Sequence, residues 1–396
     1  VVHDRMQTKF FNVKEIIDMF NGHNTKFKFI KIKPIKKLCS HTYAPFYISH
    51  YGRHGSRWMP NDSRYVWVNL HFADNSNLTP LGKKVKKLLL RVWDNARGHG
   101  GKLSRLGELQ HRGIADRMFR RFPQIFATGN HVQARSSVVD RCAKSMLAFT
   151  DELRQLQPGL DLEVKTDSAD MDWIAYTSPE VKALENRTKV TAKVSTDRFM
   201  HQLFKDISKV DDPMKLMGEL QAVASSIQDV GLNFKRYPKD IEEGLNALFT
   251  DEEFRAFYEA NNLRMTICNG NYPTNEDIPA RSAISLWDNF VAEADKALAS
   301  NKPSATLRFG HDTSLYRLLS LFNFVKPLCQ TGDSIPEKEI VLVDNVDLMD
   351  RVVPMASNLQ VVFYKSESYL DSVIVKFVLN GQLLSLDMSG DASDGS

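Results

Sequence analysis

The stretch ISHYGRHGSRW (48–58) places two histidines, two arginines and two glycines directly after PFY (45–47), an apolar run typical of a buried strand. Cationic and titratable side chains therefore stand where a strand ends and a turn begins. Ligands of open α/β sheets bind at this edge, beyond the carboxyl ends of the strands. The stretch predicts either a charged surface loop or a reaction centre, and the rest of the sequence decides between them.

The composition is that of a globular protein. The chain has 396 residues, of which 42% are hydrophobic and 25% are charged, enough for one large domain or two ordinary ones. Its net charge of +4 is too balanced for a dedicated nucleic-acid binder, although it would suit an anionic small molecule. No apolar run approaches the roughly 20 residues needed to span a bilayer. We therefore expect neither nucleic-acid nor membrane partners.

Four widely spaced cysteines bear on the compartment: Cys39, Cys142, Cys268 and Cys329. They form no CxxC pair, which argues against a structural zinc site. Buried free thiols are the simplest interpretation, and one or two disulfides stay open if the protein is exported. The chain begins at Val1 without a hydrophobic leader, so we expect either that a signal peptide has been removed or that the chain has been trimmed.

Strand patterns flank a helical middle. The segments with strand patterns are 26–37, 45–51, 305–310, 339–344, 359–365 and 372–386, the last with an Asn380-Gly381 hairpin turn. Helical patterns cover 78–93 and 131–153, begin again near Ser104, and dominate 165–300. We therefore predict one α/β domain, formed by 1–160 with 302–396, interrupted by a mostly α-helical cap at 161–301.

Three segments place polar groups just past a predicted strand or at a predicted helix start: GRHGSR (52–57), QARSS (133–137) and RFGHDTSLYRLL (308–319). Arg135 is expected at a helix N-terminus, where backbone N–H groups and the helix dipole favour an anion. If the three segments meet at one edge of the sheet, the site holds three arginines, two histidines and one carboxylate.

This inventory suits phosphoryl transfer. Arginine side chains hold the oxygens of a phosphomonoester by bidentate, charge-assisted hydrogen bonds, and Gly55 lets the phosphate approach the backbone. A neutral imidazole is a competent nucleophile near neutral pH, and a phosphohistidine divides one hydrolysis into two steps. The leaving alkoxide needs an acid, for which Asp312 is the candidate, and a carboxylic acid in this role predicts activity favoured by acidic pH.

RHGSR (53–57), followed far along the chain by GHDT (310–313), resembles the histidine acid phosphatases, the branch of the histidine phosphatase superfamily that includes the phytases. LTPLG (78–82), the QARSS…R…S pattern (133–145) and VVP (352–354) resemble segments of this family in the same order. The resemblance covers roughly the first 150 and the last 95 residues.

The resemblance implies a three-layer α/β/α phosphatase domain, no metal or cofactor, and a periplasmic or secreted location. By position, His54 is then the nucleophile, and Asp312 protonates the leaving alcohol and afterwards activates the hydrolytic water. Four further residues are implied to bind the phosphate: Arg53, Arg57, Arg135 and His311.

The chain departs from the family pattern in one loop. Trp58 and Met59 stand between the second arginine and Pro60, where the family commonly has one residue, so the loop is one residue longer. The related multiple inositol polyphosphate phosphatases commonly have His-Ala-Glu where this chain has His311-Asp312, which favours the phytase and acid phosphatase pattern.

The sequence argues against two other enzyme classes, the metal hydrolases and the serine hydrolases. His50 and His54 have the spacing of a zinc-binding helix, but Gly52 and Gly55 disfavour a helix there, and no HExxH glutamate follows. No GxSxG serine nucleophile occurs. A phosphotransferase and a non-enzymatic anion-binding protein stay open.

For the substrate we predict an inositol phosphate, with phytate preferred, and a broad acid or sugar-phosphate phosphatase, acting for example on glucose 1-phosphate, as the alternative. Basic candidates for further phosphates are Arg64, Arg187, Lys189, Lys193 and Arg198.

Overall fold

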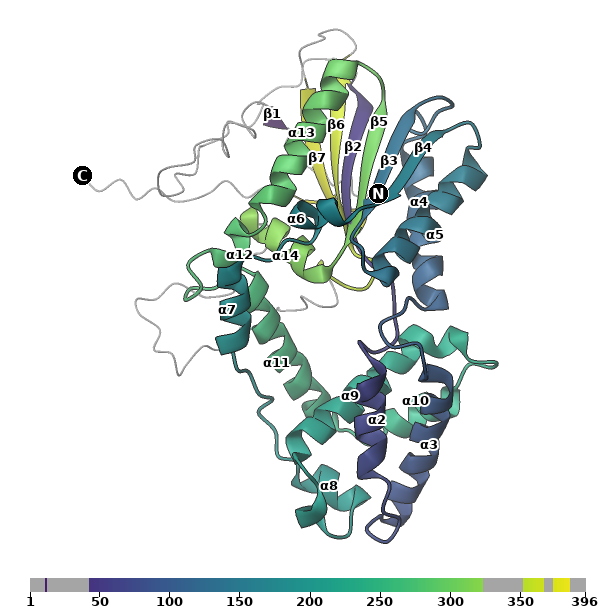
Figure 1. Cartoon of the computed structure of the whole chain (residues 1–396), viewed down its shortest axis with the longest axis vertical. Coiled ribbons are helices and arrows are strands. Elements are labelled where there is room, and N and C mark those ends of the chain that lie inside the picture. The colour runs from purple at the N-terminus through teal and green to yellow at the C-terminus, as the bar shows by residue number, and fades with distance from the viewer. Residues whose placement is uncertain (1–10, 13–42, 323–351, 367–372, 385–396) are drawn as a thin grey trace, which may run out of the picture.

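The computed structural model describes residues 11–12, 43–322, 352–366 and 373–384 (Figure 1). The strands predicted at 26–37 and 339–344, and Cys39 and Cys329, lie outside the described residues. The other two cysteines, Cys142 and Cys268, are buried free thiols. Within the described part of the chain, no helix has the length and apolar character that a membrane crossing requires.

The centre of the described part is an eight-stranded mixed sheet of order β1-β7-β6-β2-β5-β3-β4, with β8 paired to β7. The strands are β1 (Phe11–Asn12), β2 (Tyr43–Arg53), β3 (His131–Ser136), β4 (Asp161–Thr166), β5 (Ser304–Gly310), β6 (Asn358–Ser366), β7 (Val373–Leu379) and β8 (Gln382–Leu383). Strands β2, β5, β3 and β4 run parallel, and β6 and β7 are antiparallel. The predicted strands within the described residues are confirmed, including the turn at Asn380-Gly381, where both φ angles are positive.

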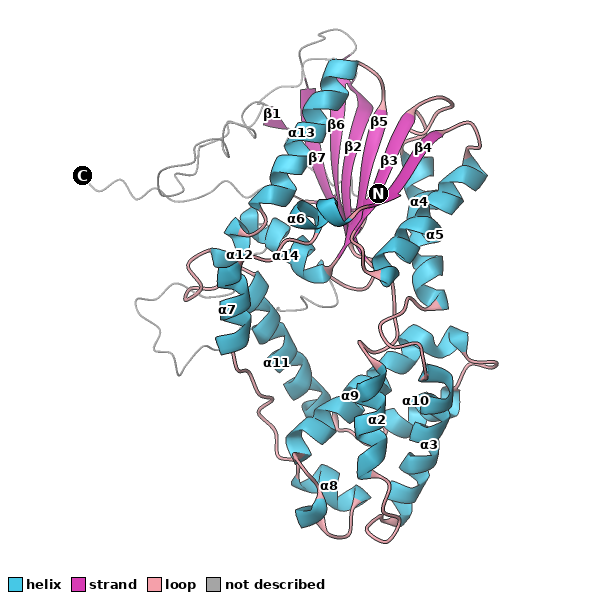
Figure 2. Cartoon of the chain, viewed as in Figure 1, coloured by secondary structure: helices cyan, strands magenta, loops and turns pink. Residues whose placement is uncertain are grey.

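Helices cover both faces of the sheet (Figure 2). One face packs on α4 (Arg105–Arg121) and α5 (Asp140–Leu156), and the other on α6 (Met171–Ile174), α12 (Ile278–Arg281), α13 (Ile284–Ser300) and α14 (Asp312–Leu321). Side chains alternate between the faces: Ile48 packs with the first group and Tyr47 with the second. The predicted three-layer α/β/α fold is therefore confirmed.

The remaining helices form a second core at the other end of the molecule (Figure 1). They are α2 (Asp62–His71), α3 (Pro80–Ala96), α8 (Asp197–Leu203), α9 (Pro213–Val230) and α10 (Lys239–Asn246), while α7 (Pro179–Arg187) and the long α11 (Asp251–Asn269) run between the two ends. Helix α3 begins as predicted, with Thr79 accepting a hydrogen bond from the Gly82 N–H. We call this part the helical domain.

The domain boundaries differ from the prediction in two places. Helices α2 and α3, expected in the α/β domain, pack in the helical domain, since Val85 and Leu89 join its core. Strand β4 and helices α6, α12 and α13, expected in the cap, belong to the sheet domain, because β4 pairs with β3 and side chains of the three helices pack on the sheet. The apolar period of a helix locates its buried side but not which of two cores that side joins.

Candidate active site

The carboxyl ends of three parallel strands meet at one edge of the sheet. Arg53, the last residue of β2, lies opposite Gly310, the last residue of β5. Ser136, which ends β3, lies opposite Phe309. Helix α14 begins immediately after β5, with His311 as N-cap and Asp312 as its first residue. The structure therefore brings the RHGSR and GHDT segments together, as expected from the edge rule.

His54 is buried, with 2% of its surface exposed, and its backbone is held from both sides. Its N–H donates to the Gly310 carbonyl at 3.0 Å, and its carbonyl accepts from the Ala356 N–H at 3.0 Å. The ring Nδ1 lies 2.9 Å from the Gly55 carbonyl oxygen. Because a carbonyl only accepts, Nδ1 carries the proton and Nε2 keeps its lone pair. Burial and the charge of Arg53 lower the pKa of His54 well below its ordinary value, so the ring is neutral.

The loop after His54 packs closely on the start of α4. A Cβ atom on Gly55 would lie 2.5 Å from the Gly107 carbonyl oxygen, so only glycine fits there. The Ser56 N–H donates to Gln110 Oε1 at 2.8 Å, and the Ser56 carbonyl accepts from Ser104 Oγ at 2.9 Å. These contacts fix the turn that carries His54, the predicted nucleophile, and its neighbouring arginines; we call residues 53–57 the nucleophile loop.

Arg53 is a buried cation paired with Asp312, the predicted acid. Its Nη2 lies 2.9 Å from Asp312 Oδ2, and its Nη1 donates to the Val353 carbonyl. Its backbone N–H donates to the Ser357 carbonyl at 2.8 Å. The VVP segment and the residues after it therefore also hold the nucleophile loop.

Asp312 opens α14, where the helix dipole favours a negative charge. Its Oδ1 accepts a hydrogen bond from the Thr313 N–H at 2.9 Å. Burial opposes ionisation, but Arg53 and this hydrogen bond outweigh it and lower the pKa of Asp312 below its ordinary value. With 24% of its side chain exposed, the carboxyl group is accessible from the site.

His311 lies beside His54, with the two ring centroids 5.9 Å apart. Its backbone N–H donates to Tyr51 Oη at 3.1 Å, and its Nε2 lies 3.3 Å from Ser137 Oγ. Burial and the charge of Arg141 lower the pKa of His311 to about 4, against the effect of Asp312. A neutral ring here can donate one hydrogen bond to a bound oxygen.

Of the two remaining arginine candidates, one lies in the site and the other does not. Arg57 joins the site: burial, with Arg141 and Arg53, lowers its pKa to about 10, and Asp312 opposes this shift. Arg135 does not join it. Its Nη1 lies 2.7 Å from Glu163 Oε1 on β4, and it stands inside strand β3 opposite Arg308.

The prediction of a helix over 131–153, with Arg135 at its N-terminus, is wrong at its start. QARS lies in β3, with alternating burial along the strand, and α5 begins only at Asp140 after the N-cap Val139. Arg141, in the first turn of α5, is the arginine whose charge acts on His54, Arg57 and His311. The period-two pattern of HVQARS was the available signal for the strand.

The longer loop after Arg57 connects the two domains. Trp58 is 1% exposed, and its ring lies 6.3 Å from Phe234 and 5.2 Å from His99 by centroids. Trp58 and Met59 both belong to the helical core. The additional residue therefore anchors the nucleophile loop in the helical domain.

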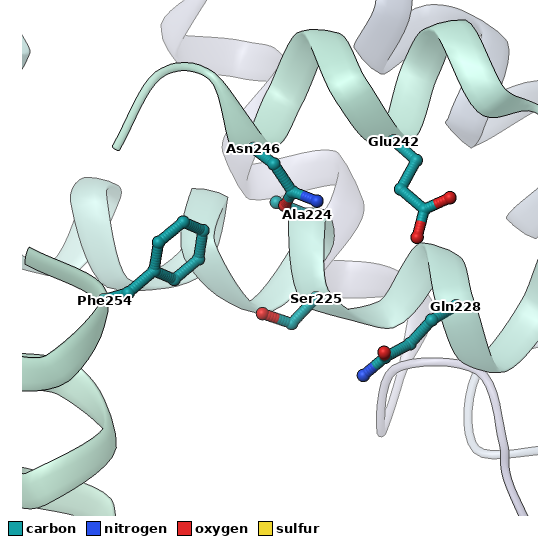
Figure 3. A pocket seen from close by; sticks show the side chains of 6 residues that line it. All are labelled: Ala224, Ser225, Gln228, Glu242, Asn246 and Phe254. Atoms are coloured by element: carbon teal, nitrogen blue, oxygen red, sulfur yellow. The ribbon is translucent and has the colours of Figure 1, made fainter. Parts of the chain in front are cut away.

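Two further features limit what the described residues can hold. No group of three or more His, Cys, Asp or Glu side chains among them is arranged to hold a metal ion. A cavity of about 270 Å³ between α9 and α10 is lined by neutral side chains and one carboxylate, Glu242, without a cation (Figure 3). The lining of this cavity gives a phosphate no positive partner.

The three-layer α/β/α fold brings the RHGSR and HD segments to one edge of the sheet, as the resemblance to the histidine acid phosphatases led us to expect. No family model matches the chain. Multiple inositol polyphosphate phosphatase 1 of Gallus gallus is 26% identical over 275 residues, 66% of this chain and 58% of that protein, so this chain spans less than two thirds of its length.

Two solved structures share the fold. The multiple inositol polyphosphate phosphatase of Bifidobacterium longum, in complex with inositol hexasulfate, has a TM-score of 0.67 at 16% identity, over 91% of each chain. The phytase from D. castellii has a TM-score of 0.60 at 13% identity, over 87% of this chain and 74% of that one. Together with the curated relative, they confirm the predicted resemblance to the histidine acid phosphatases. Because both groups match, the Asp312 that follows His311 does not separate the phytases from the multiple inositol polyphosphate phosphatases.

Proposed function

We propose that this chain hydrolyses phosphomonoesters through a phosphohistidine at His54, and that its substrates are inositol phosphates. The observation that carries the proposal is the state of His54: Nδ1 donates to the Gly55 carbonyl, which leaves the lone pair of Nε2 for the substrate. This nucleophile stands among arginines, with Asp312 paired to Arg53 beside it.

In the first step, Nε2 of His54 attacks phosphorus, and the bond from phosphorus to the ester oxygen breaks. Asp312 gives its proton to the leaving oxygen, which departs as an alcohol. The guanidinium groups of Arg53, Arg57 and Arg141 stabilise the charge on the three peripheral oxygens, and the neutral His311 donates a hydrogen bond to one of them.

In the second step, water attacks the phosphohistidine. Asp312, now ionised, takes a proton from the water, the bond from phosphorus to Nε2 breaks, and inorganic phosphate leaves. His54 is returned with the proton still on Nδ1, because the Gly55 carbonyl holds that tautomer. No metal is needed in either step.

Acidic pH favours this cycle. In the free protein the pKa of Asp312 is held below its ordinary value, so the carboxyl group is mostly ionised at neutral pH. A bound phosphate draws on the same arginines and adds negative charge, which raises the pKa of Asp312 and lets it carry the proton that the leaving group requires.

The names of the relatives support the inositol phosphate assignment, since they are multiple inositol polyphosphate phosphatases and a phytase. Two basic candidates for further phosphates are already paired: Arg64 lies 2.7 Å from Glu219, and Arg198 pairs with Glu253. The exposed candidates are Arg187, Lys189 and Lys193. We place phytate first among the inositol phosphates on this basis.

The test is phosphate release from phytate, glucose 1-phosphate and a chromogenic monoester, across acidic and neutral pH with EDTA present. Chelator-resistant turnover that is lost in His54→Ala and strongly reduced in Asp312→Asn is the expected result. Phytate turnover no faster than that of glucose 1-phosphate would overturn the substrate preference. Full activity of His54→Ala would overturn the mechanism, and phosphate passed to an added alcohol would reveal a transferase.

A further inference from the structure

A carboxylate from the helical domain reaches the nucleophile loop. Asp229 lies in the last turn of α9, and its Oδ1 accepts a hydrogen bond from Ser56 Oγ at 2.7 Å. Gln110 Nε2 donates to the same hydroxyl oxygen at 3.1 Å, while Gln110 Oε1 accepts from the Ser56 N–H. Because Gln110 supplies a donor, the single proton of the Ser56 hydroxyl must point to Asp229.

The position is unfavourable for a carboxylate. Burial raises the pKa of Asp229, against the effects of Ser56, Arg53 and Arg57. A negative charge near a helix C-terminus is also disfavoured by the helix dipole. Neighbouring Ile227 and Val230 are fully buried in the helical core, which fixes the place of Asp229. The hydrogen bond from Ser56 and the charges of Arg53 and Arg57 therefore favour the ionised form of Asp229, and its own helix does not.

We infer that Asp229 is a positioning residue that couples the helical domain to the phosphate-binding residues Arg53 and Arg57. Through Ser56 it holds the nucleophile loop, and its negative charge opposes binding of the phosphate dianion. This inference rests on the proposed function, since it names a second determinant of the same anion site. In the free protein the carboxylate partly neutralises Arg53 and Arg57. A bound dianion interacts with the same two arginines, so the negative charge of Asp229 weakens binding of the dianion and assists its release.

The charges that face Asp229 come from the nucleophile loop, where Arg53 and Arg57 attract it, while α4 presents the neutral Gln110. Protonation of Asp229 removes its repulsion of an anion. Anion affinity should therefore be highest at low pH and fall as pH rises through the titration of Asp229. Asparagine at this position, which can accept the same hydrogen bond without charge, should remove that part of the pH dependence.

The experiment is calorimetric titration of the full chain with sulfate, which remains a dianion over the acidic range in which phosphate changes charge. Asp229→Asn is expected to bind sulfate about threefold to tenfold more tightly than wild type near neutral pH, and equally at low pH. Asp229→Glu keeps the negative charge and should bind sulfate with wild-type affinity. Ser56→Ala, which keeps the charge but removes the hydrogen bond, should lower kcat without tightening sulfate binding.

Glu219→Gln is the matched control, because Glu219 is a partly buried carboxylate on the same helix, paired with Arg64 away from the loop. Its sulfate affinity should equal that of wild type, and thermal unfolding of each variant reports any loss of folding. Equal sulfate affinity of wild type and Asp229→Asn at every pH would overturn the inference. A hundredfold loss of kcat in Asp229→Asn with unchanged sulfate binding would instead make Asp229 a proton donor. Failure of the wild-type chain to bind sulfate would be a failure of the proposed function itself.

Discussion

Exchange of Arg141 for glutamine tests the arrangement of the site most directly. Arg141 lies in α5, outside the segment QARSS that was predicted to join the site, yet its charge acts on His54, Arg57 and His311. Arg135 lies inside β3 and pairs with Glu163. We therefore expect Arg141→Gln to damage phosphate binding and Arg135→Gln to leave it nearly intact.

The size of the effect follows from the charge-assisted hydrogen bonds that Arg141 would give to a bound phosphate. A hydrogen bond from a charged group contributes about 1.5 to 3 kcal/mol, and each 1.4 kcal/mol corresponds to about tenfold in affinity. Arg141→Gln should thus raise the dissociation constant of inorganic phosphate by about 10-fold to 100-fold. Removal of the cation should also raise the pKa of His311 from about 4 toward its ordinary value.

Both quantities are measurable on the same samples. Calorimetry gives the phosphate affinity, and NMR titration of the histidine ring gives the pKa of His311, with Arg135→Gln as the matched arginine control. Because Arg135 contributes to neither quantity, its variant should resemble wild type in both. An equal loss of phosphate binding in the two variants would refute the placement of Arg141 in the clamp, and an unmoved His311 pKa in Arg141→Gln would refute its proximity to that ring.

Three other predictions concern the frame around the site. Gly55→Ala should cost about 1 to 3 kcal/mol in urea unfolding and lower kcat, because its Cβ would meet the Gly107 carbonyl; unchanged stability would mean that the loop is free to move. Tyr51→Phe should cost a similar amount and raise KM, since Tyr51 Oη accepts from the His311 N–H and donates to the Ile174 carbonyl; a variant equal to wild type in both would contradict this role. Burial lowers the pKa of His50 to about 3 and that of His111 to about 4, so the unfolded chain binds more protons below about pH 6.5, and stability should fall as pH drops from there toward 4. His111→Asn should flatten that fall in pH-dependent urea unfolding, and an identical slope would argue against a buried neutral His111.

Much of the fold is predictable because short-range patterns in the sequence carry the information. The run PFYISHY predicts β2, and the glycines of RHGSR predict a turn at its end. His311 and Asp312 follow β5 directly, so their arrival at the same edge depends only on the two strands being parallel neighbours. The sequence patterns therefore predicted both the fold class and the meeting of nucleophile and acid.

Features that depend on tertiary packing are not predictable from such patterns. Arg135 and Arg141 are six residues apart, and only the end of β3 at Ser136 decides which of them faces the site. Asp229 comes from a helix far along the chain, and nothing in the amphipathic pattern of α9 indicates that its last turn reaches Ser56. Such contacts arise from how two cores are joined, which local periodicity does not encode.

The charges of the site explain why we expect substrate binding to be coupled to the uptake of one proton. Arg53, Arg57 and Arg141 bring three positive charges, and Asp312 and Asp229 bring two negative ones, so the free site has one net positive charge. A bound phosphomonoester dianion makes the net charge one negative, which a buried site does not favour. Uptake of one proton restores neutrality. Asp312 is the carboxyl group whose low pKa depends most directly on Arg53, the arginine that the substrate also engages. Under the proposed mechanism, we expect the bound substrate to weaken the pairing of Arg53 with Asp312 and so to favour the protonated form of Asp312, where the leaving oxygen needs the proton.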